Sequence, residues 1–306
     1  IIITNLAGKV LPHNEYEISW DASAAERGGF EHFMLKEIFE QPKAIADTLL
    51  GRISGLGSDV TKGIDLKDID KVVIVACGTA YHAGLVGKYA IEKWANIAVD
   101  VELASEYRYR DPNVDKKTLL IPISQSGETM DTLMAMRYAK EKGAKVFSVC
   151  NTNGSTIPRE SDAVLYTHAG PEIAVASTKA FETQLIAMYL MGLHLGRIRG
   201  TISASLMAEI EGELAELPAK VEQVLETVEP LRELTKKFSK STSVLFLGRH
   251  VGYPTALEGA LKLKELAYMH AEGFAGGELK HGPIALIESG TPVVAIMPAA
   301  GSLLAE

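Results

Sequence analysis

The chain has 306 residues, of which 47% are hydrophobic and 23% charged, and its formal net charge is −8. This composition is typical of a globular protein. The negative charge disfavours nucleic acid as a partner, no apolar run approaches the roughly 18–20 residues that cross a membrane, and two cysteines exclude a disulfide scaffold. We therefore expect a cytoplasmic protein, and the length favours two domains.

The first 45 residues form a segment distinct from the regular pattern that follows. A turn-rich stretch runs from Ala7 to Asn14 and leads to Trp20, and two short helices are predicted after it, over 31–40 and 42–53. Apolar residues form a stripe on the first helix. Pro42 suits the first turn of the second because the N–H that proline lacks is not needed there.

A regular alternation of strands and helices comes next. Residues 72–76 are a short apolar run rich in β-branched side chains, which indicates a buried strand, and Gly78 and a helix over 81–94 follow. Four more strands are predicted, at 99–103, 118–123, 145–150 and 163–167. A helix over 129–142 ends at Gly143, a favourable residue for that position. The alternation predicts an α/β fold in which helices flank a parallel sheet, as in a flavodoxin-like three-layer sandwich.

Two further helices are predicted at 177–197 and 203–227, and Pro218 is expected to kink or break the second. From residue 243 the first pattern returns. Three landmarks recur at offsets of 170–172 residues: Gly78 as Gly248, Glu106 as Glu278 and Ile121 as Val293. This favours an internal duplication, although any two parallel α/β domains share so general a pattern. The second repeat stops just after its third predicted strand, 291–297, so we expect an incomplete second domain with an unpaired sheet edge.

The loop after the predicted strand 118–123 is rich in hydroxyl groups. Four of its nine residues carry one: Ser124, Ser126, Thr129 and Thr132. They precede a helix N-terminus, where free N–H groups and the helix dipole favour anions, and the end of a parallel strand is where ligands bind. Helix capping is the alternative, but it needs only one hydroxyl. The sequence therefore favours a phosphate site, and the absence of Gly-Lys-Ser/Thr argues against a nucleotide P-loop.

Cys77, Gly78 and Thr79 form a second loop, at the end of the first predicted strand. Cys77 is either a nucleophile or, as we favour, a small buried apolar residue. The glycines at 78, 84 and 87 do not match G-x-G-x-x-G, which disfavours a dinucleotide site.

Acid–base candidates occur on a helix predicted over 255–270 and in the segment after it. Lys262 shares a helix face with Glu265 and with Glu258, as expected either for surface ion pairs or for a proton-transfer site. The glycine-bracketed segment 276–283 carries Glu278, Lys280 and His281. Histidine is the commonest general acid or base, but a solvated turn explains this segment equally well.

Taken in order and spacing, these segments resemble the glucosamine-6-phosphate synthase family. The resemblance rests on residues 25–30, 34–38, 77–79, 124–129, 175–181 and 277–283. It implies a fold of two sugar-isomerase (SIS) domains. Residues 1–45 would be a linker after a missing glutaminase domain, 46–235 the first SIS domain with a connecting helix, and 236–306 the N-terminal half of the second.

The resemblance also implies the reaction and the residues that carry it. Fructose 6-phosphate and glutamine-derived ammonia would give glucosamine 6-phosphate, in a homodimer, without a metal or other cofactor and without nucleic acid or membrane partners. Glu265 would move a proton between C1 and C2 of the sugar with Lys262 beside it, and His281 would open the sugar ring in the neighbouring subunit's site. The implied substrate-binding residues are Cys77, Gly78, Thr79, Ser124, Gln125, Ser126, Thr129, Val175, Ala176 and Ser177.

The chain departs from the family pattern at three places. Ala80 stands where many members carry serine, and the glutaminase part and a C-terminal tail with a reactive lysine are absent from the sequence. We therefore expect this chain alone not to release ammonia from glutamine. The alternatives are a stand-alone ketose–aldose phosphosugar isomerase or deglycase, which would not need the linker, and a non-catalytic phosphosugar sensor.

Overall fold

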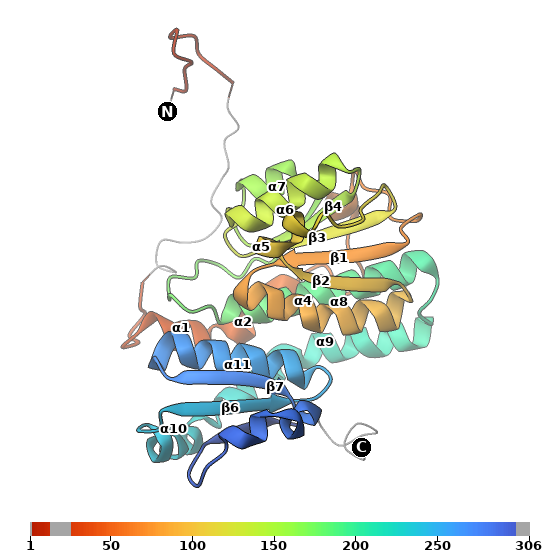
Figure 1. The fold of residues 1–306 in the computed structure, drawn as a ribbon. Helices are drawn as coiled ribbons and strands as arrows, with labels where there is room; N and C mark the ends of the chain where they lie inside the picture. Colours follow the sequence, from red (N-terminus) through yellow and green to blue (C-terminus); the bar gives the residue numbers. More distant parts are fainter. Residues whose placement is uncertain (1, 13–25, 298–306) are drawn as a thin grey trace.

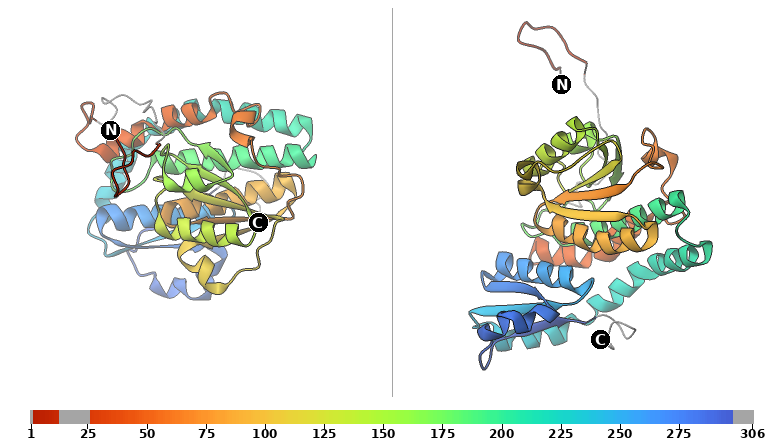
Figure 2. Two further views of the ribbon diagram at one scale, coloured as in Figure 1. Left: turned by 90° about the horizontal axis from the view of Figure 1, so that it is seen from above. Right: turned by 45° about the vertical axis from the view of Figure 1, so that its right-hand side comes forward.

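The computed structural model describes residues 2–12 and 26–297. Part of the turn-rich stretch predicted near the N-terminus, and the last nine residues, lie outside the described residues. Two parallel sheets lie one above the other, with helices α4 and α11 between them (Figure 1). Figure 2 shows from a second direction that the second sheet lies beyond these helices and does not continue the first.

The first sheet has five parallel strands in the order β2-β1-β3-β4-β5. Their bounds are Lys71–Ala76 (β1), Ala98–Leu103 (β2), Thr118–Ser124 (β3), Lys145–Cys150 (β4) and Ala163–Tyr166 (β5). Each coincides with a predicted strand to within one residue at either end. Every residue of β3 is buried, as expected for a central strand of a parallel sheet.

Helices cover both faces of this sheet. Alternate residues of β1 belong to two different cores: Val72 and Ile74 pack with the helices on one side, Val73 and Val75 with those on the other. On the first side lie α2 (Gln41–Leu49), α4 (Gly78–Ala95) and α8 (Lys179–Arg199); on the second lie α5 (Ala104–Tyr107), α6 (Met130–Glu141) and α7 (Thr156–Glu160). The predicted three-layer α/β fold is confirmed.

The second sheet repeats the topology of the first. Its strands are β6 (Ser243–Gly248), β7 (His270–Ala275) and β8 (Val293–Ile296), parallel and in the order β7-β6-β8. This matches β2-β1-β3, and α11 (Gly252–Ala267) crosses from β6 to β7 as α4 crosses from β1 to β2. The shared topology supports the predicted duplication.

A break at Pro218, one of the two outcomes expected there, is wrong. Helix α9 (Ala204–Leu225) runs through Pro218 without interruption. Proline removes one backbone hydrogen bond, but α9 packs along α2 and buries Leu214, and this tertiary packing outweighs the local penalty.

Several short elements were not anticipated. They include α3 (Ser58–Thr61), α5, α7, α10 (Val228–Phe238) and three 3-10 helices at Arg108–Arg110 (η2), Gly276–His281 (η3) and Pro283–Leu286 (η4). The first predicted helix is α1 (Phe33–Phe39). Helix α11 starts and ends three residues before its predicted bounds, which leaves room for strand β7. No helix in the described part of the chain has the length and hydropathy to cross a membrane.

Candidate functional site

The hydroxyl-rich loop occupies the turn from β3 into α6, as predicted. Ser124 Oγ lies 2.9 Å from Thr129 Oγ1 and accepts the N–H of Gly127 at 3.0 Å. Ser126 Oγ accepts the N–H of Glu128 at 3.2 Å. Thr129 is the N-cap residue of α6, yet its side chain makes no capping hydrogen bond. Capping therefore does not account for the Thr129 hydroxyl, and the loop presents hydroxyl and N–H groups at a helix N-terminus, where an anion is favoured.

The geometry of this loop depends on glycine and on the neighbouring turn. Gly127 has φ +67°, and a Cβ built there would lie 2.0 Å from Ser155 Oγ, so no larger residue fits. Glu128 accepts the N–H of Thr156 at 2.7 Å and its hydroxyl at 3.1 Å. The Thr156 hydroxyl and N–H hold the pKa of Glu128 below its usual value. The loop is thus anchored to the turn that follows β4.

The Cys-Gly-Thr loop lies beside the hydroxyl-rich loop because β1 pairs with β3. Cys77 Sγ is 4.0 Å from the hydroxyl of Thr132, in the first turn of α6. Gly78 opens α4 with φ +54° and is exposed, and Thr79 and Gln125 are half-buried. The two loops share the carboxyl edge of the sheet, as the sequence predicted.

The first turn of α4 meets α11 of the second repeat. The Thr79 hydroxyl donates to Glu258 Oε1 at 2.9 Å and accepts from Lys262 Nζ at 3.1 Å. Lys262 Nζ lies 2.5 Å from Glu265 Oε2 and 3.4 Å from Glu258 Oε1. Three predicted site residues, Thr79, Lys262 and Glu265, therefore come together across the two repeats. The side chain of Glu265 is 35% exposed and can meet a ligand, whereas that of Glu258 is 7% exposed.

Sequence reasoning missed the fifth member of this cluster, His82. Its Nδ1 lies 2.7 Å from Glu258 Oε2, and both side chains are largely buried. Glu258 had appeared only as a helical neighbour of Lys262. The available signal for His82 was its place three residues after Thr79 on α4, which puts the two side chains on the same helix face.

Glu182, in the first turn of α8, adds a further carboxyl near Glu258. Burial, and then the charge of Glu258, raises the pKa of Glu182 to about 7. The raised pKa favours the neutral form of this carboxyl, which limits the negative charge next to Glu258.

The raised pKa predicts a pH-dependent stability that Glu182→Gln removes. The pKa of the Glu182 carboxyl is about 4.5 in the unfolded chain and about 7 in the folded one. As the pH rises between these values, the unfolded chain ionises first, which lowers the free energy of unfolding by on the order of 2–3 kcal/mol. In urea unfolding we expect the variant to match wild type near pH 4.5 and to be more stable at pH 8. Glu226→Gln, at an exposed carboxylate of the chain, is the matched control and should keep the wild-type profile. An unchanged profile for Glu182→Gln would contradict this account.

The segment before α8 holds the other implied sugar contacts. Val175 is fully exposed, Ala176 is 1% exposed and Ser177 is half-buried. Glu172 anchors the segment from within, accepting the N–H of Thr178 at 2.8 Å and a hydrogen bond from the Ser177 side chain. In the described part of the chain, no hydrogen bond joins 175–177 to the hydroxyl-rich loop or to α11.

Helix α1 fixes this segment from outside. The carboxylate of Glu37, which is 2% exposed, accepts the N–H groups of Ile173 at 2.6 Å and Ala174 at 3.1 Å. Lys179 donates to Glu40 at 2.7 Å. The predicted linker thus packs as part of the fold, against the loop that carries Val175.

His281 is placed apart from the other candidates. It is the last residue of η3 and is exposed. Among the described residues no hydrogen bond or ion pair links it to Glu265 or Lys262. Its action in a neighbouring subunit stays a prediction.

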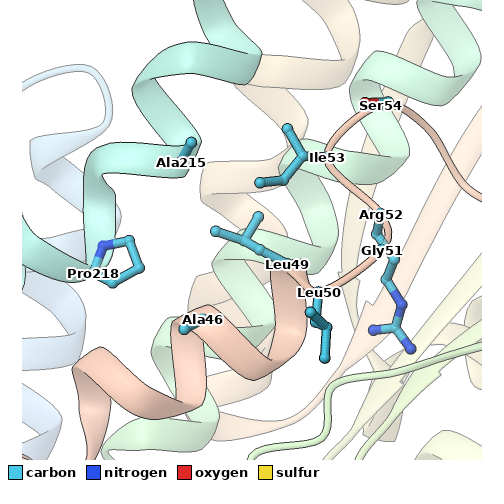
Figure 3. A pocket seen from close by; sticks show the side chains of 9 residues that line it. All are labelled: Ala46, Leu49, Leu50, Gly51, Arg52, Ile53, Ser54, Ala215 and Pro218. Atoms are coloured by element: carbon cyan, nitrogen blue, oxygen red, sulfur yellow. The ribbon is translucent and has the colours of Figure 1, made fainter.

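Two clefts are bordered by α9. One, between α2 and α9, is lined by Ala46, Leu49, Leu50, Gly51, Arg52, Ile53, Ser54, Ala215 and Pro218 (Figure 3). In this cleft the guanidinium group of Arg52 donates hydrogen bonds to the backbone carbonyls of Thr48 and Tyr166. The other, between α4 and α9, contains Tyr89 and Trp94. Neither contains a predicted site residue, and the described residues hold no cluster of ligands for a metal ion.

Comparison with known proteins identifies the class. The SIS-domain family model matches residues 65–193 and 237–302, more than half of the chain. The chain therefore belongs to the SIS-domain family, and within it to the C-terminal domains of the glucosamine–fructose-6-phosphate aminotransferases. The resemblance inferred from the motifs is confirmed.

Named relatives support the assignment. The C-terminal domain of glucosamine-fructose-6-phosphate aminotransferase from Francisella tularensis is 42% identical, with a TM-score of 0.88 over 92% of this chain and 79% of that one. Glutamine–fructose-6-phosphate aminotransferase (isomerizing) from Streptomyces coelicolor is 62% identical over 97% of this chain and 49% of its own length. The corresponding Mycobacterium tuberculosis protein is 61% identical over 92% and 46%. The chain thus spans about half the length of these curated relatives.

Proposed function

We propose that this chain carries the sugar-isomerising site of an enzyme that makes glucosamine 6-phosphate from fructose 6-phosphate and ammonia. The observation that carries the proposal is the meeting of Thr79, Lys262 and Glu265 next to the hydroxyl-rich loop. An anion site and an accessible carboxylate paired with an ammonium group are what isomerisation of a phosphosugar requires. The relatives' printed names support the same reaction.

The hydroxyl-rich loop has the role of anchoring the substrate. Ser124, Gln125, Ser126 and Thr129 hold the phosphate, which is remote from the reacting carbons, and the 77–79 and 175–177 segments contact the sugar. Holding the phosphate fixes the position of C1 and C2 relative to α11, so binding energy is used to orient the reaction.

Glu265 has the role of the proton carrier. Ammonia condenses with the C2 carbonyl of the open-chain ketose and releases water, which leaves an imine at C2. The Glu265 carboxylate takes a proton from C1 and returns it to C2, while the proton of the C1 hydroxyl passes to nitrogen; C1 becomes the aldehyde carbon and C2 carries the amine. Lys262, 2.5 Å away, holds the carboxylate in place.

The remaining assignments extend this proposal to the whole protein. Residues 46–235 form the first SIS domain and 236–306 the N-terminal half of the second, and 1–45 join them to a glutaminase domain that supplies ammonia. The protein is a cytoplasmic homodimer in which His281 opens the sugar ring in the partner's site. The exposure of His281 and the lack of a hydrogen bond or ion pair between it and Glu265 among the described residues support a role outside its own subunit.

The test is an activity assay on the full-length product of the source gene. With fructose 6-phosphate and glutamine we expect glucosamine 6-phosphate, and with fructose 6-phosphate alone a slower formation of glucose 6-phosphate, both followed by mass spectrometry. Unphosphorylated fructose is the control and should not react. Binding of fructose 6-phosphate without any product would favour the phosphosugar sensor, and glucose 6-phosphate alone the stand-alone isomerase.

A further inference from the structure

His82 and Glu258 make a buried contact that the proposed mechanism does not use. The His82 side chain is 13% exposed and that of Glu258 7%, and 2.7 Å separates His82 Nδ1 from Glu258 Oε2. The other oxygen of Glu258 faces Thr79 and Lys262. A histidine, a carboxylate, an ammonium group and Glu265 thus follow one another in a continuous chain of contacts.

We propose that His82 is a positioning residue for proton transfer: it fixes Glu258, and through Glu258 the ammonium group of Lys262 beside Glu265. This inference rests on the proposed function, because it assigns a task within the same site. In this proposal His82 acts through Glu258 and Lys262 and not on the substrate itself.

The burial of Glu258 gives the first argument. A buried carboxylate needs hydrogen-bond donors on both oxygens, and a donor that is lost leaves an expensive unpaired acceptor. His82 occupies Oε2, while Thr79 and Lys262 occupy Oε1. Without His82 the carboxylate is free to rotate toward other donors, and Lys262 loses a defined partner.

The chemistry of the contact gives the second argument. An ionised carboxylate only accepts, so Nδ1 of His82 carries the hydrogen, and this fixes which ring nitrogen is protonated. The imidazole of His82 thus orients the carboxylate of Glu258, and the 2.7 Å between Nδ1 and Oε2 is short enough for a strong hydrogen bond.

The position of the contact in the fold suggests a rival explanation, in which the contact only holds the two repeats together. His82 belongs to α4 of the first repeat and Glu258 to α11 of the second, so their bond joins the repeats. A contact that only held the repeats together would lower stability and substrate affinity when removed. A positioning contact lowers the rate of proton transfer and leaves phosphosugar affinity nearly unchanged.

Two substitutions at His82 separate these explanations. His82→Ala removes the donor, whereas in His82→Asn the side-chain amide nitrogen replaces Nδ1 as a donor to Glu258. In the full-length gene product we expect His82→Ala to lower kcat for isomerisation about 10–100-fold with KM for fructose 6-phosphate within about threefold, and His82→Asn to restore most of the loss. His270→Ala, at an exposed histidine of β7, is the matched control and should behave as wild type.

A second measurement reports on Lys262 without relying on turnover. An amine-modifying reagent followed by peptide mass spectrometry should label Lys262 several-fold faster in His82→Ala than in wild type, with other lysines unchanged, and His82→Asn should reverse this. If the wild-type protein shows no turnover, that result counts against the proposed function. The labelling of Lys262 still decides the role of His82 in that case. Unchanged kcat and labelling in His82→Ala, or a loss confined to KM and thermal stability, would overturn the inference.

Discussion

Glu265→Gln is expected to abolish isomerisation of fructose 6-phosphate, by about 10³-fold or more in kcat, while binding of the sugar phosphate survives. Glutamine has nearly the shape of glutamate and still accepts a hydrogen bond from Lys262, which lies 2.5 Å from Glu265 Oε2. It cannot take up a proton at neutral pH, so the variant keeps the geometry of the site and loses the base. A loss of kcat with sugar-phosphate binding retained is therefore due to the missing base and not to a change in the structure of the site.

The measurement uses the full-length gene product and two readouts. Product formation from fructose 6-phosphate is followed by mass spectrometry, and affinity for glucose 6-phosphate by calorimetry. Glu272→Gln, at a half-exposed carboxylate on β7, is the matched control. Near-normal turnover in Glu265→Gln would remove the assigned proton carrier and with it the proposed mechanism.

The strands and their order illustrate how far sequence patterns reach. Buried parallel strands are continuous apolar runs, so β1, β3 and β4 stand out in the sequence. Strand β7, the second strand that the duplication implies, does not stand out, because its sequence, His270–Ala275, contains no β-branched residue and one glycine in its interior. Its formation depends on pairing with β6, which no local pattern reveals. The break expected at Pro218 does not occur for the same reason, since packing of α9 against α2 outweighs local propensity.

The site shows the same limit at the level of side chains. The hydroxyl-rich loop could be predicted because strand, loop and helix are consecutive, so its position follows from the fold class. The contact between His82 and Glu258 joins residues 176 positions apart on different repeats. Only the packing of α4 against α11 brings them together. The same packing leaves the side chain of Lys262 18% exposed, between the carboxylates of Glu258 and Glu265.

A second large effect is expected from the double substitution Ser124→Ala with Thr129→Ala. The two hydroxyls lie 2.9 Å apart at the N-terminus of α6, and Ser124 is 2% exposed. Hydrogen bonds to a charged phosphate contribute about 1.5–3 kcal/mol each, so losing two should weaken phosphosugar affinity by about 100-fold or more. Affinity for the unphosphorylated sugar should change by less than about twofold, because the sugar-contacting segments are untouched.

Calorimetry with fructose 6-phosphate and ligand-observed NMR with fructose measure the two affinities separately. The matched control is Thr201→Ala with Ser205→Ala: Thr201 donates to the carbonyl of Trp94 near the far end of α4, away from the hydroxyl-rich loop, and Ser205 lies on α9. The control should bind both ligands as wild type does. Equal losses for phosphorylated and unphosphorylated sugar in the Ser124/Thr129 variant would mean that these hydroxyls support the fold of the loop and do not bind phosphate. A loss of affinity for the phosphorylated sugar alone would place the phosphate at the N-terminus of α6. Carbons C1 and C2 of the bound sugar would then face the Lys262–Glu265 pair.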